Sequence, residues 1–251
     1  MSAPPADPLS LAVLVIGAAV AGFVTGLAGF GTGLVASGFW FHALAAPMVP
    51  PLVTLTSVAG QLVGLVAVRK AFDWRRAIPY LAGGLIGVPF GLLALEAVSP
   101  DALRFSMGVF LVLYAASQLA GLSRLRLRRE SSAVLDGTIG AGGGFMGGFA
   151  GLSGPLPLIW LQLQGGPADG QRAVYQPFNM LVLTAAGAGM ALTGQMDRGV
   201  LLTAAICLPA TVVGAIVGSR VYVGVDERRF RQVVLALLLV SGLMLVAKEL
   251  F

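Results

Sequence analysis

GFVTGLAGFGTGLV, residues 22–35, places five glycines in fourteen positions of a strongly apolar part of the chain. A segment embedded in lipid must satisfy its backbone N–H and C=O groups internally, as an α-helix does. Glycine favours a helix less than any residue except proline. Either the helix is interrupted here, or the glycines let a second helix approach closely. The two alternatives imply different functions for the stretch.

The composition is that of a polytopic membrane protein. Of the 251 residues, 57% are hydrophobic and 11% are charged, against roughly a quarter charged in soluble domains. Several apolar runs approach the roughly 20 residues that cross a hydrocarbon core. We expect the first run to be retained, because it lacks the basic residue and the cleavage site of a signal peptide. The runs cover residues 9–25, 29–46, 51–68, 77–95, 102–122, 133–150, 152–164, 174–193, 199–219 and 232–247.

The basic residues are distributed unevenly along the chain. Thirteen of the 16 Lys and Arg residues fall in four groups, at 69–76, 124–129, 172 and 220–231. Cytoplasmic loops of membrane proteins are enriched in Lys and Arg. We therefore expect the four groups to be cytoplasmic and both termini to lie outside. The basic pI is explained by this topology, and no nucleic-acid partner is expected.

The quoted stretch has a counterpart in the second half of the chain. GFMGGFAGLSGPLP, residues 144–157, aligns with it at an offset of 122 residues. Further along, GLIGVPFG at 84–91 aligns with TVVGAIVG at 211–218 at an offset of 127. The alternative is that glycine-rich membrane helices resemble each other by composition alone.

These alignments predict two repeats, residues 1–122 and 133–251, joined by a basic cytoplasmic linker at 123–132. The basic loop at 69–76 corresponds to a loop around Asp197 that belongs on the opposite side of the membrane. The repeats are therefore expected to be inverted, as in many secondary transporters. We predict an all-α fold in which each repeat is a hairpin of two short helices at a Gly-rich break, followed by three transmembrane helices.

A break in each hairpin would leave a helix N-terminus inside the protein. Such an end carries unpaired N–H groups and about half a positive charge, so it attracts anions. Two converging ends with hydroxyl and amide donors around them can offset the desolvation of an ion. Close helix packing of the small-xxx-small type explains the same glycines equally well.

The glycine-rich LAGFGTG near the start, its repeat FAGLSGP, the basic mid-chain linker and the length resemble the TauE/SafE family of membrane permeases, the sulfite exporter family. The resemblance covers nearly the whole chain and implies a multi-pass protein of the bacterial inner membrane. In that membrane, the outside location that the charges predict for both termini is the periplasm. It implies a secondary transporter, expected to be an exporter, of sulfite, organosulfonates or related small anions. Phe30 and Thr32 interrupt the first motif where the family pattern is richer in glycine.

The candidate site consists of the two breaks and the neutral polar residues that follow them. Asp and Glu residues all fall near the ends of the apolar runs, whereas a cation carrier usually needs buried carboxylates, so the pattern favours an anion or a neutral solute. Ser57 and Asn179 share the 122 offset and are expected to face the pseudo-symmetric centre. Interhelical hydrogen bonding is the alternative role for these two. The candidate residues are Gly29, Phe30, Gly31, Thr32, Ser57, Gln61, Gly151, Ser153, Gly154, Gln176 and Asn179.

Other functional classes fit the sequence less well. A single His and a single Cys exclude a multi-His or multi-Cys metal centre, and no histidine is placed to activate Ser153, so neither an enzyme nor a cofactor is expected. A passive anion channel would share the helix-end site, and a structural membrane partner would lack it. The expected partners are a small anion, a coupling proton or ion, and the lipid bilayer. The identity of the anion, the direction of transport, the coupling ion and the oligomeric state are left open.

Overall fold

The helix that contains the opening glycines is interrupted at Gly29. In the computed structural model, α1 (Pro8–Ala28) ends there with a backbone φ of 79°. Helix α2 (Thr32–Ala43) begins after Gly31, whose φ is 109°. These left-handed values suit glycine, which has no Cβ to clash. The structure describes residues 7–68, 72–121, 132–221 and 227–250.

The second half contains a matching interruption. Helix α6 (Ala133–Ala150) ends at Gly151, whose φ is 72°, and α7 (Pro155–Gln164) begins after Gly154. Both expected breaks are therefore present. The expectation of two short helices in each hairpin is wrong for the first members, because α1 has 21 residues and α6 has 18.

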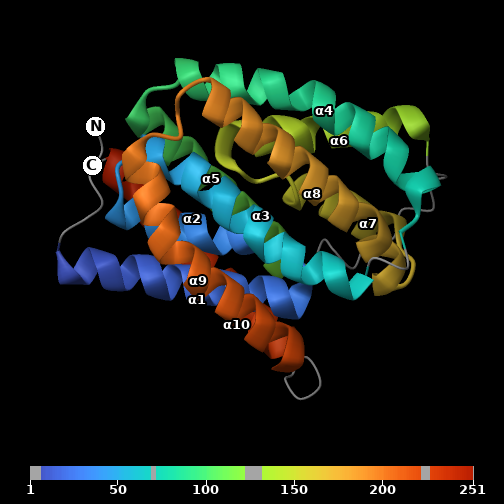
Figure 1. Ribbon diagram of the computed structural model, residues 1–251. Coiled ribbons are helices and arrows are strands. Elements are labelled where there is room, and N and C mark those ends of the chain that lie inside the picture. Colours follow the sequence, from blue (N-terminus) through green and yellow to red (C-terminus); the bar gives the residue numbers. More distant parts are fainter. Residues whose placement is uncertain (1–6, 69–71, 122–131, 222–226, 251) are drawn as a thin grey trace.

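The remaining helices complete a bundle (Figure 1). Asp73 and Ser99 cap α4 and α5, each accepting a hydrogen bond from a backbone N–H of the first turn. The described residues form helices and no strands, in agreement with the all-α expectation. The other elements are a short 3₁₀ turn η1 (Ala46–Met48), α3 (Val49–Val68), α4 (Trp74–Ala97), α5 (Pro100–Leu119), α8 (Ala168–Leu192), α9 (Arg198–Val221) and α10 (Glu227–Leu250).

Six of the described helices are long and apolar enough to cross a membrane, which makes the chain a multi-pass membrane protein. Helix α8 has 25 residues but is too polar to be among them. The six stretches are Pro8–Ala28, Ala46–Val63, Trp74–Ala97, Pro100–Leu119, Arg198–Arg220 and Gln232–Leu250.

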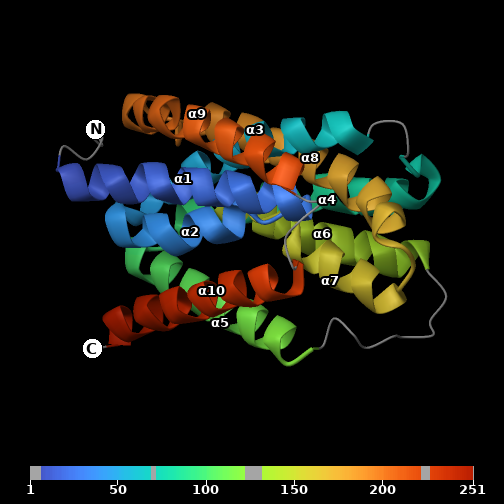
Figure 2. The ribbon, with the colours of Figure 1, turned by 90° about the horizontal axis from the view of Figure 1, so that it is seen from below.

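The two ends of the bundle differ in charge. Helix α1 begins and α10 ends at one end, and α4 and α8 begin at the other (Figure 2). We call the latter the basic end, because Arg75, Arg76 and Arg172 lie within the first five residues of α4 and α8. The linker at 123–132 lies outside the described residues except for Ser132.

Glycines on α1 and α9 let the two helices touch backbone to backbone. A methyl group at Gly26 would overlap the carbonyl oxygen of Ala215, and one at Gly218 would overlap that of Phe23. The pair α4 and α6 repeats the arrangement, with Gly148 against the carbonyl of Val88. The close-packing alternative therefore explains the glycines within helices, while the break explains Gly29, Gly31 and Gly151.

The contacts of the two helix pairs correspond residue by residue. Gly22 lies against Thr211, and Gly144 lies against Gly84. Residues 22 and 144 are related by the offset of 122, and residues 84 and 211 by the offset of 127. Both offsets read from the sequence thus recur in the packing.

A buried carboxylate anchors α7 at the basic end. Asp136, in the first turn of α6, is 2% exposed. Its Oδ1 accepts hydrogen bonds from Tyr80 Oη at 2.8 Å, Trp160 Nε1 at 2.8 Å and Gln164 Nε2 at 3.0 Å. Asp136 lies at a helix end, as its position near the end of an apolar run indicates, but the sequence did not reveal that it is buried.

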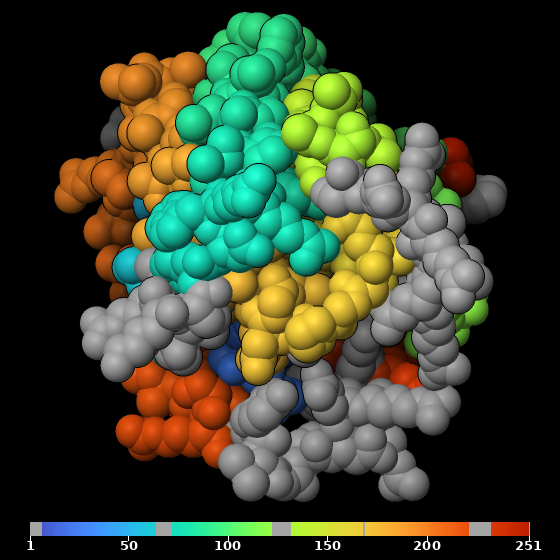
Figure 3. Space-filling model, turned by 90° about the vertical axis from the view of Figure 1, so that its right-hand side faces the viewer, coloured from blue at the N-terminus to red at the C-terminus, as the bar shows by residue number. Residues whose placement is uncertain are grey.

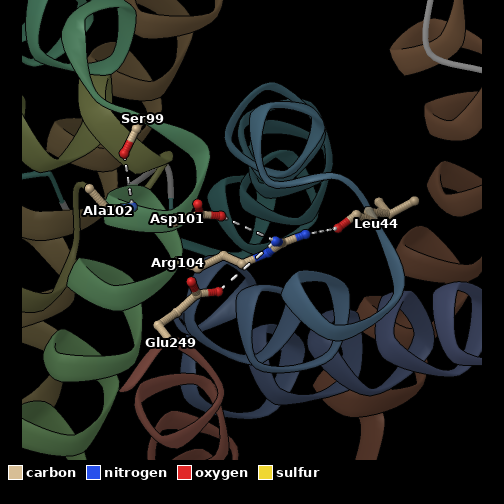
Figure 4. A network of polar contacts seen from close by, with 6 residues as sticks. All are labelled: Leu44, Ser99, Asp101, Ala102, Arg104 and Glu249. Carbon is tan, nitrogen blue, oxygen red and sulfur yellow. Dashed lines mark hydrogen bonds and ion pairs between the residues drawn. The ribbon is translucent and has the colours of Figure 1, made fainter. Parts of the chain in front are cut away.

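At the end of the bundle opposite the basic end, a positively charged side chain contacts several helices. Arg104 on α5 donates a hydrogen bond to the carbonyl of Leu44, at the C-terminus of α2, at 3.4 Å. The same guanidinium lies 3.9 Å from Asp101 and 4.0 Å from Glu249 of α10 (Figure 4). Arg104 therefore ties together the ends of three helices.

Candidate functional site

The two breaks meet inside the bundle. A Cβ at Gly33, in the first turn of α2, would lie 2.6 Å from Leu152 Cδ2 and 3.1 Å from the carbonyl oxygen of Gly151. Between the breaks lies a cavity of about 30 Å³, which α3 and α8 also line. We call it the inner cavity. Its volume corresponds to about one water molecule.

Most of the residues selected from the sequence line the inner cavity. Gly29 and Gln176 do not, and they lie beside each other, with Gln176 Nε2 3.4 Å from the position of a Cβ on Gly29. The selected residues that the structure brings together there are Phe30, Gly31, Thr32, Ser57, Gln61, Gly151, Ser153, Gly154 and Asn179.

Five further lining residues were not selected from the sequence. Leu183 is 122 residues after Gln61, and Leu152 is 122 residues after Phe30, so the repeat offset would have identified both. Their apolar side chains give no sign of a binding role in the sequence. The five are Gly33, Leu34, Leu152, Pro155 and Leu183.

The inner cavity offers neutral polar groups. Ser57 is 3% exposed, and its Oγ has no hydrogen-bond partner in the described part of the chain. Ser153 Oγ donates to Asn179 Oδ1 at 3.0 Å. This bond orients the amide of Asn179, whose Nδ2 carries two donor hydrogens. Thr32 is hydrogen-bonded to Thr25 of α1.

The two helix ends at the inner cavity are not equivalent as donors. The first N–H groups of an α-helix have no acceptor within the helix. All residues of the first turn of α2, beginning at Thr32, carry an N–H. Helix α7 begins Pro-Leu-Pro, and Pro155 and Pro157 have no N–H to donate. The α2 end therefore presents more backbone donors than the α7 end.

The site contains no built-in charge or metal ligand set. The described residues that line the inner cavity are all uncharged. Within the described ranges no group of three or more His, Cys, Asp or Glu is placed to hold a metal ion. A negatively charged solute in this cavity would meet only dipoles.

A larger hollow of about 210 Å³ adjoins the inner cavity towards the basic end. We call it the vestibule; it is lined by α1, α2, α5, α7, α8 and α10, and its polar residues are Tyr114, Gln162, Gln171, Arg172 and Tyr175. Figure 3 looks onto this end, where blue atoms from the early part of the described chain are visible between those of α8 and α9. The sequence marks Arg172 only as part of the topology signal and does not indicate that it lines the vestibule.

The chain resembles proteins of one family. A family model described as Sulfite exporter TauE/SafE matches residues 14–245. A protein of Cupriavidus necator named probable sulfite/organosulfonate exporter TauE is 30% identical over 209 residues, which are 80% of this chain and 77% of that protein. No solved structure matches the chain.

Proposed function

The chain belongs to the sulfite exporter TauE/SafE family, and from this membership we propose that it carries small sulfur-containing anions, such as sulfite or organosulfonates, out of the cell across the bacterial inner membrane. The relative from Cupriavidus necator bears the name of an exporter of these compounds. The observation that carries the proposal is the buried hydroxyl of Ser57, which has no hydrogen-bond partner among the described residues and lies in a cavity between two helix N-termini.

The inner cavity, of about 30 Å³, must enlarge to admit sulfite or an organosulfonate, and the donors around it are of the right strength for an anion. A helix N-terminus stabilises a negative charge by typically 0.3–1 kcal/mol and by about 2 kcal/mol when partly buried. Desolvation of an ion costs several kcal/mol, so the helix ends alone are insufficient. Hydrogen bonds to a charged group add about 1.5–3 kcal/mol each, which Ser57 and Asn179 can supply. A carrier needs such a balance, because it must also release the anion.

The two halves of the chain act in this proposal as inverted repeats. Equivalent backbone contacts of α1 with α9 and of α6 with α4 support a repeated architecture. The lining of the inner cavity supports it too, since Phe30, Ser57 and Gln61 have counterparts there at the offset of 122. If the two repeats exchange their conformations, the site opens first to one side of the membrane and then to the other.

The basic end faces the cytoplasm in the proposed orientation. Arg75, Arg76 and Arg172 lie at this end, and short loops that carry Lys and Arg stay in the cytoplasm. Because α1 begins and α10 ends at the opposite end (Figure 2), both termini are then periplasmic.

Thermal unfolding of the detergent-purified protein tests the substrate class. A ligand that binds only the folded state raises its stability, so we expect sulfite, thiosulfate, taurine or sulfoacetate at millimolar concentration to raise the melting temperature. Sulfate and simple carboxylates serve as comparison anions. If none of the sulfur-containing anions raises the melting temperature, the proposed substrate class is wrong.

Asn179→Leu tests the site itself. This variant removes the amide from the inner cavity, so the shift produced by the active anion should vanish. Thr184→Val is the matched control, because Thr184 lies on the same helix but is exposed and bonds its own helix through Met180 at 2.7 Å. An unchanged shift in Asn179→Leu, with the control intact, would exclude Asn179 from the site.

A further inference from the structure

Phe30 lies between the inner cavity and the vestibule. Together with Gly31 and Leu34 it lines both hollows, and it has the largest side chain of the three. We infer that Phe30 is the gate on the basic side of the site and that Leu152 is its counterpart on the opposite side. This assignment deepens the proposed function, since it describes how a solute would reach the same inner cavity. It concerns access and makes no assumption about the chemistry of the solute.

The ring of Phe30 is held by an aromatic contact with α8. It meets Tyr175 nearly perpendicularly, at 83°, with 6.3 Å between the ring centroids. Tyr175 in turn donates a hydrogen bond from its hydroxyl to the carbonyl of Ala28, at the end of α1, at 3.2 Å. An edge-to-face pair contributes only about 0.5–1.5 kcal/mol beyond its buried area. Thermal motion can therefore break this contact.

The backbone around Phe30 is suited to movement. Phe30 stands between two glycines in left-handed conformation, Gly29 with φ 79° and Gly31 with φ 109°. Glycine changes its backbone angles at little steric cost. Phe30 supplies the only side chain of this three-residue connection between α1 and α2, so a small change of the connection moves the ring.

Access from the opposite end is blocked by more than one residue. Leu152 is 2% exposed and lines the inner cavity at the position that corresponds to Phe30. The counterparts of vestibule residues there are buried side chains: Trp40 corresponds to Gln162 and Val53 to Tyr175 at the offset of 122, and Leu111 corresponds to Leu238 at the offset of 127. At these corresponding positions, buried side chains therefore take the place of a hollow like the vestibule.

The difference between the basic side and the opposite side of the inner cavity predicts different effects for the removal of Phe30 and of Leu152. On the basic side, Phe30, Gly31 and Leu34 line both a hollow of about 210 Å³ and a cavity of about 30 Å³. Removing the ring should join the two spaces. Removing Leu152 should enlarge the inner cavity and leave it closed, because buried side chains, Trp40, Val53 and Leu111, occupy the positions that correspond to vestibule residues.

A cysteine placed in the inner cavity tests the gate without any transport assay. Cys207, the sole cysteine, is buried and lies away from both hollows, so Cys207→Ala provides the background. Ser57→Cys then reports access. The purified protein is treated with sulfonatoethyl methanethiosulfonate, and the labelling rate is followed by mass spectrometry. Phe30→Ala should raise this rate at least tenfold, and Leu152→Ala should change it less than twofold.

A second variant of Phe30 tests whether faster labelling in Phe30→Ala comes only from misfolding. Phe30→Trp keeps an aromatic ring and fills more space, so it should slow the labelling of Ser57→Cys. Each variant is accepted only with an unchanged size-exclusion profile, and Phe30→Leu replaces Phe30→Ala if the latter aggregates. Equal rates in the Phe30 and Leu152 variants, or faster labelling in Phe30→Trp, would show that Phe30 is not the gate.

Protection experiments separate this inference from the proposed function. The reporter here is Leu183→Cys in the Cys207→Ala background, because Leu183 also lines the inner cavity and the hydroxyl of Ser57 stays in place. Sulfoacetate or taurine, added before the reagent, should slow the labelling of Leu183→Cys if the inner cavity binds such anions. Absence of protection together with a tenfold gate effect would contradict the anion site and leave the gate standing. Protection without a gate effect would support the anion site and contradict the assignment of Phe30 as the gate.

Discussion

Glycines that look alike in the sequence have two different structural roles. Gly26 packs against the backbone of α9, where any side chain would overlap Ala215. Gly29, three residues later, ends the helix with a left-handed backbone. One role depends on the absence of a Cβ between helices, and the other depends on freedom of φ.

The packing role predicts a sharp contrast between two positions on α6. Gly144→Ala places a methyl group on the carbonyl of Gly84, so overpacking should cost about 1–3 kcal/mol of stability and lower the melting temperature. Gly137→Ala is the control, because its Cβ would lie 3.6 Å from the carbonyl oxygen of Pro79 in ordinary contact. Alanine also favours a helix more than glycine does. Equal melting temperatures for the two variants would contradict the packing role.

The candidate site was largely predictable from single residues and the repeat offset. Ser57 and Asn179 were selected because they share the offset of 122, and both line the inner cavity. Gln176 is a polar residue in the part of the second half that matches residues 54–61, but it lies beside Gly29, outside the lining. The vestibule was not predictable, because it depends on how α5, α7, α8 and α10 are placed around Phe30.

Helices were predicted well in number and less well in extent. Each of the ten apolar runs corresponds to one of the ten α-helices of the described chain. Helix α8 begins at Ala168 and α10 at Glu227, several residues before their runs at 174 and 232. A search for apolar runs misses these polar first turns. The backbone hydrogen bonds of a helix continue through residues that do not face lipid.

Arg104 stabilises the C-terminus of α2, so we expect its replacement to lower the stability of the protein. Arg104→Leu removes the hydrogen bond to Leu44 and the cation near a helix C-terminus (Figure 4). The ion pairs at 3.9 and 4.0 Å are long and should add little. We expect a loss of about 1.5–3 kcal/mol, as for hydrogen bonds of charged groups, measured as a lower melting temperature in detergent.

Arg198→Leu is the control for this measurement. Arg198 is exposed and opens α9 at the same end of the bundle, where a positive charge at a helix N-terminus is unfavourable. Its removal should leave the melting temperature unchanged or slightly higher. An equal decrease in both variants would mean that loss of positive charge, rather than the bond to Leu44, is responsible.

The molecule as a whole combines two equivalent helix pairs with two unequal ends. The equivalence of α1–α9 and α6–α4 follows offsets that are visible in the sequence. The inequality of the ends was only partly visible, since the charges indicated a basic side but not the vestibule behind it.

The proposed orientation in the membrane is directly testable with single cysteines in the Cys207→Ala background. Ala97, at the end of α4, and Asp169, in the first turn of α8, are both exposed and lie at opposite ends of the bundle. Ala97→Cys should react with an impermeant maleimide in intact cells whose outer membrane admits the reagent. Asp169→Cys should react only after the inner membrane is permeabilised, and the reversed pattern would invert the orientation.

The prolines at the start of α7 leave the two halves of the site chemically unequal. If each half in turn faces one compartment, the same solute is held with a different affinity on each face of the bilayer. Detailed balance prevents this inequality from concentrating the solute by itself, because the rates around a closed cycle must agree in both directions. The prolines therefore set the concentration at which each face saturates, and an applied gradient alone decides the sign of the net flux.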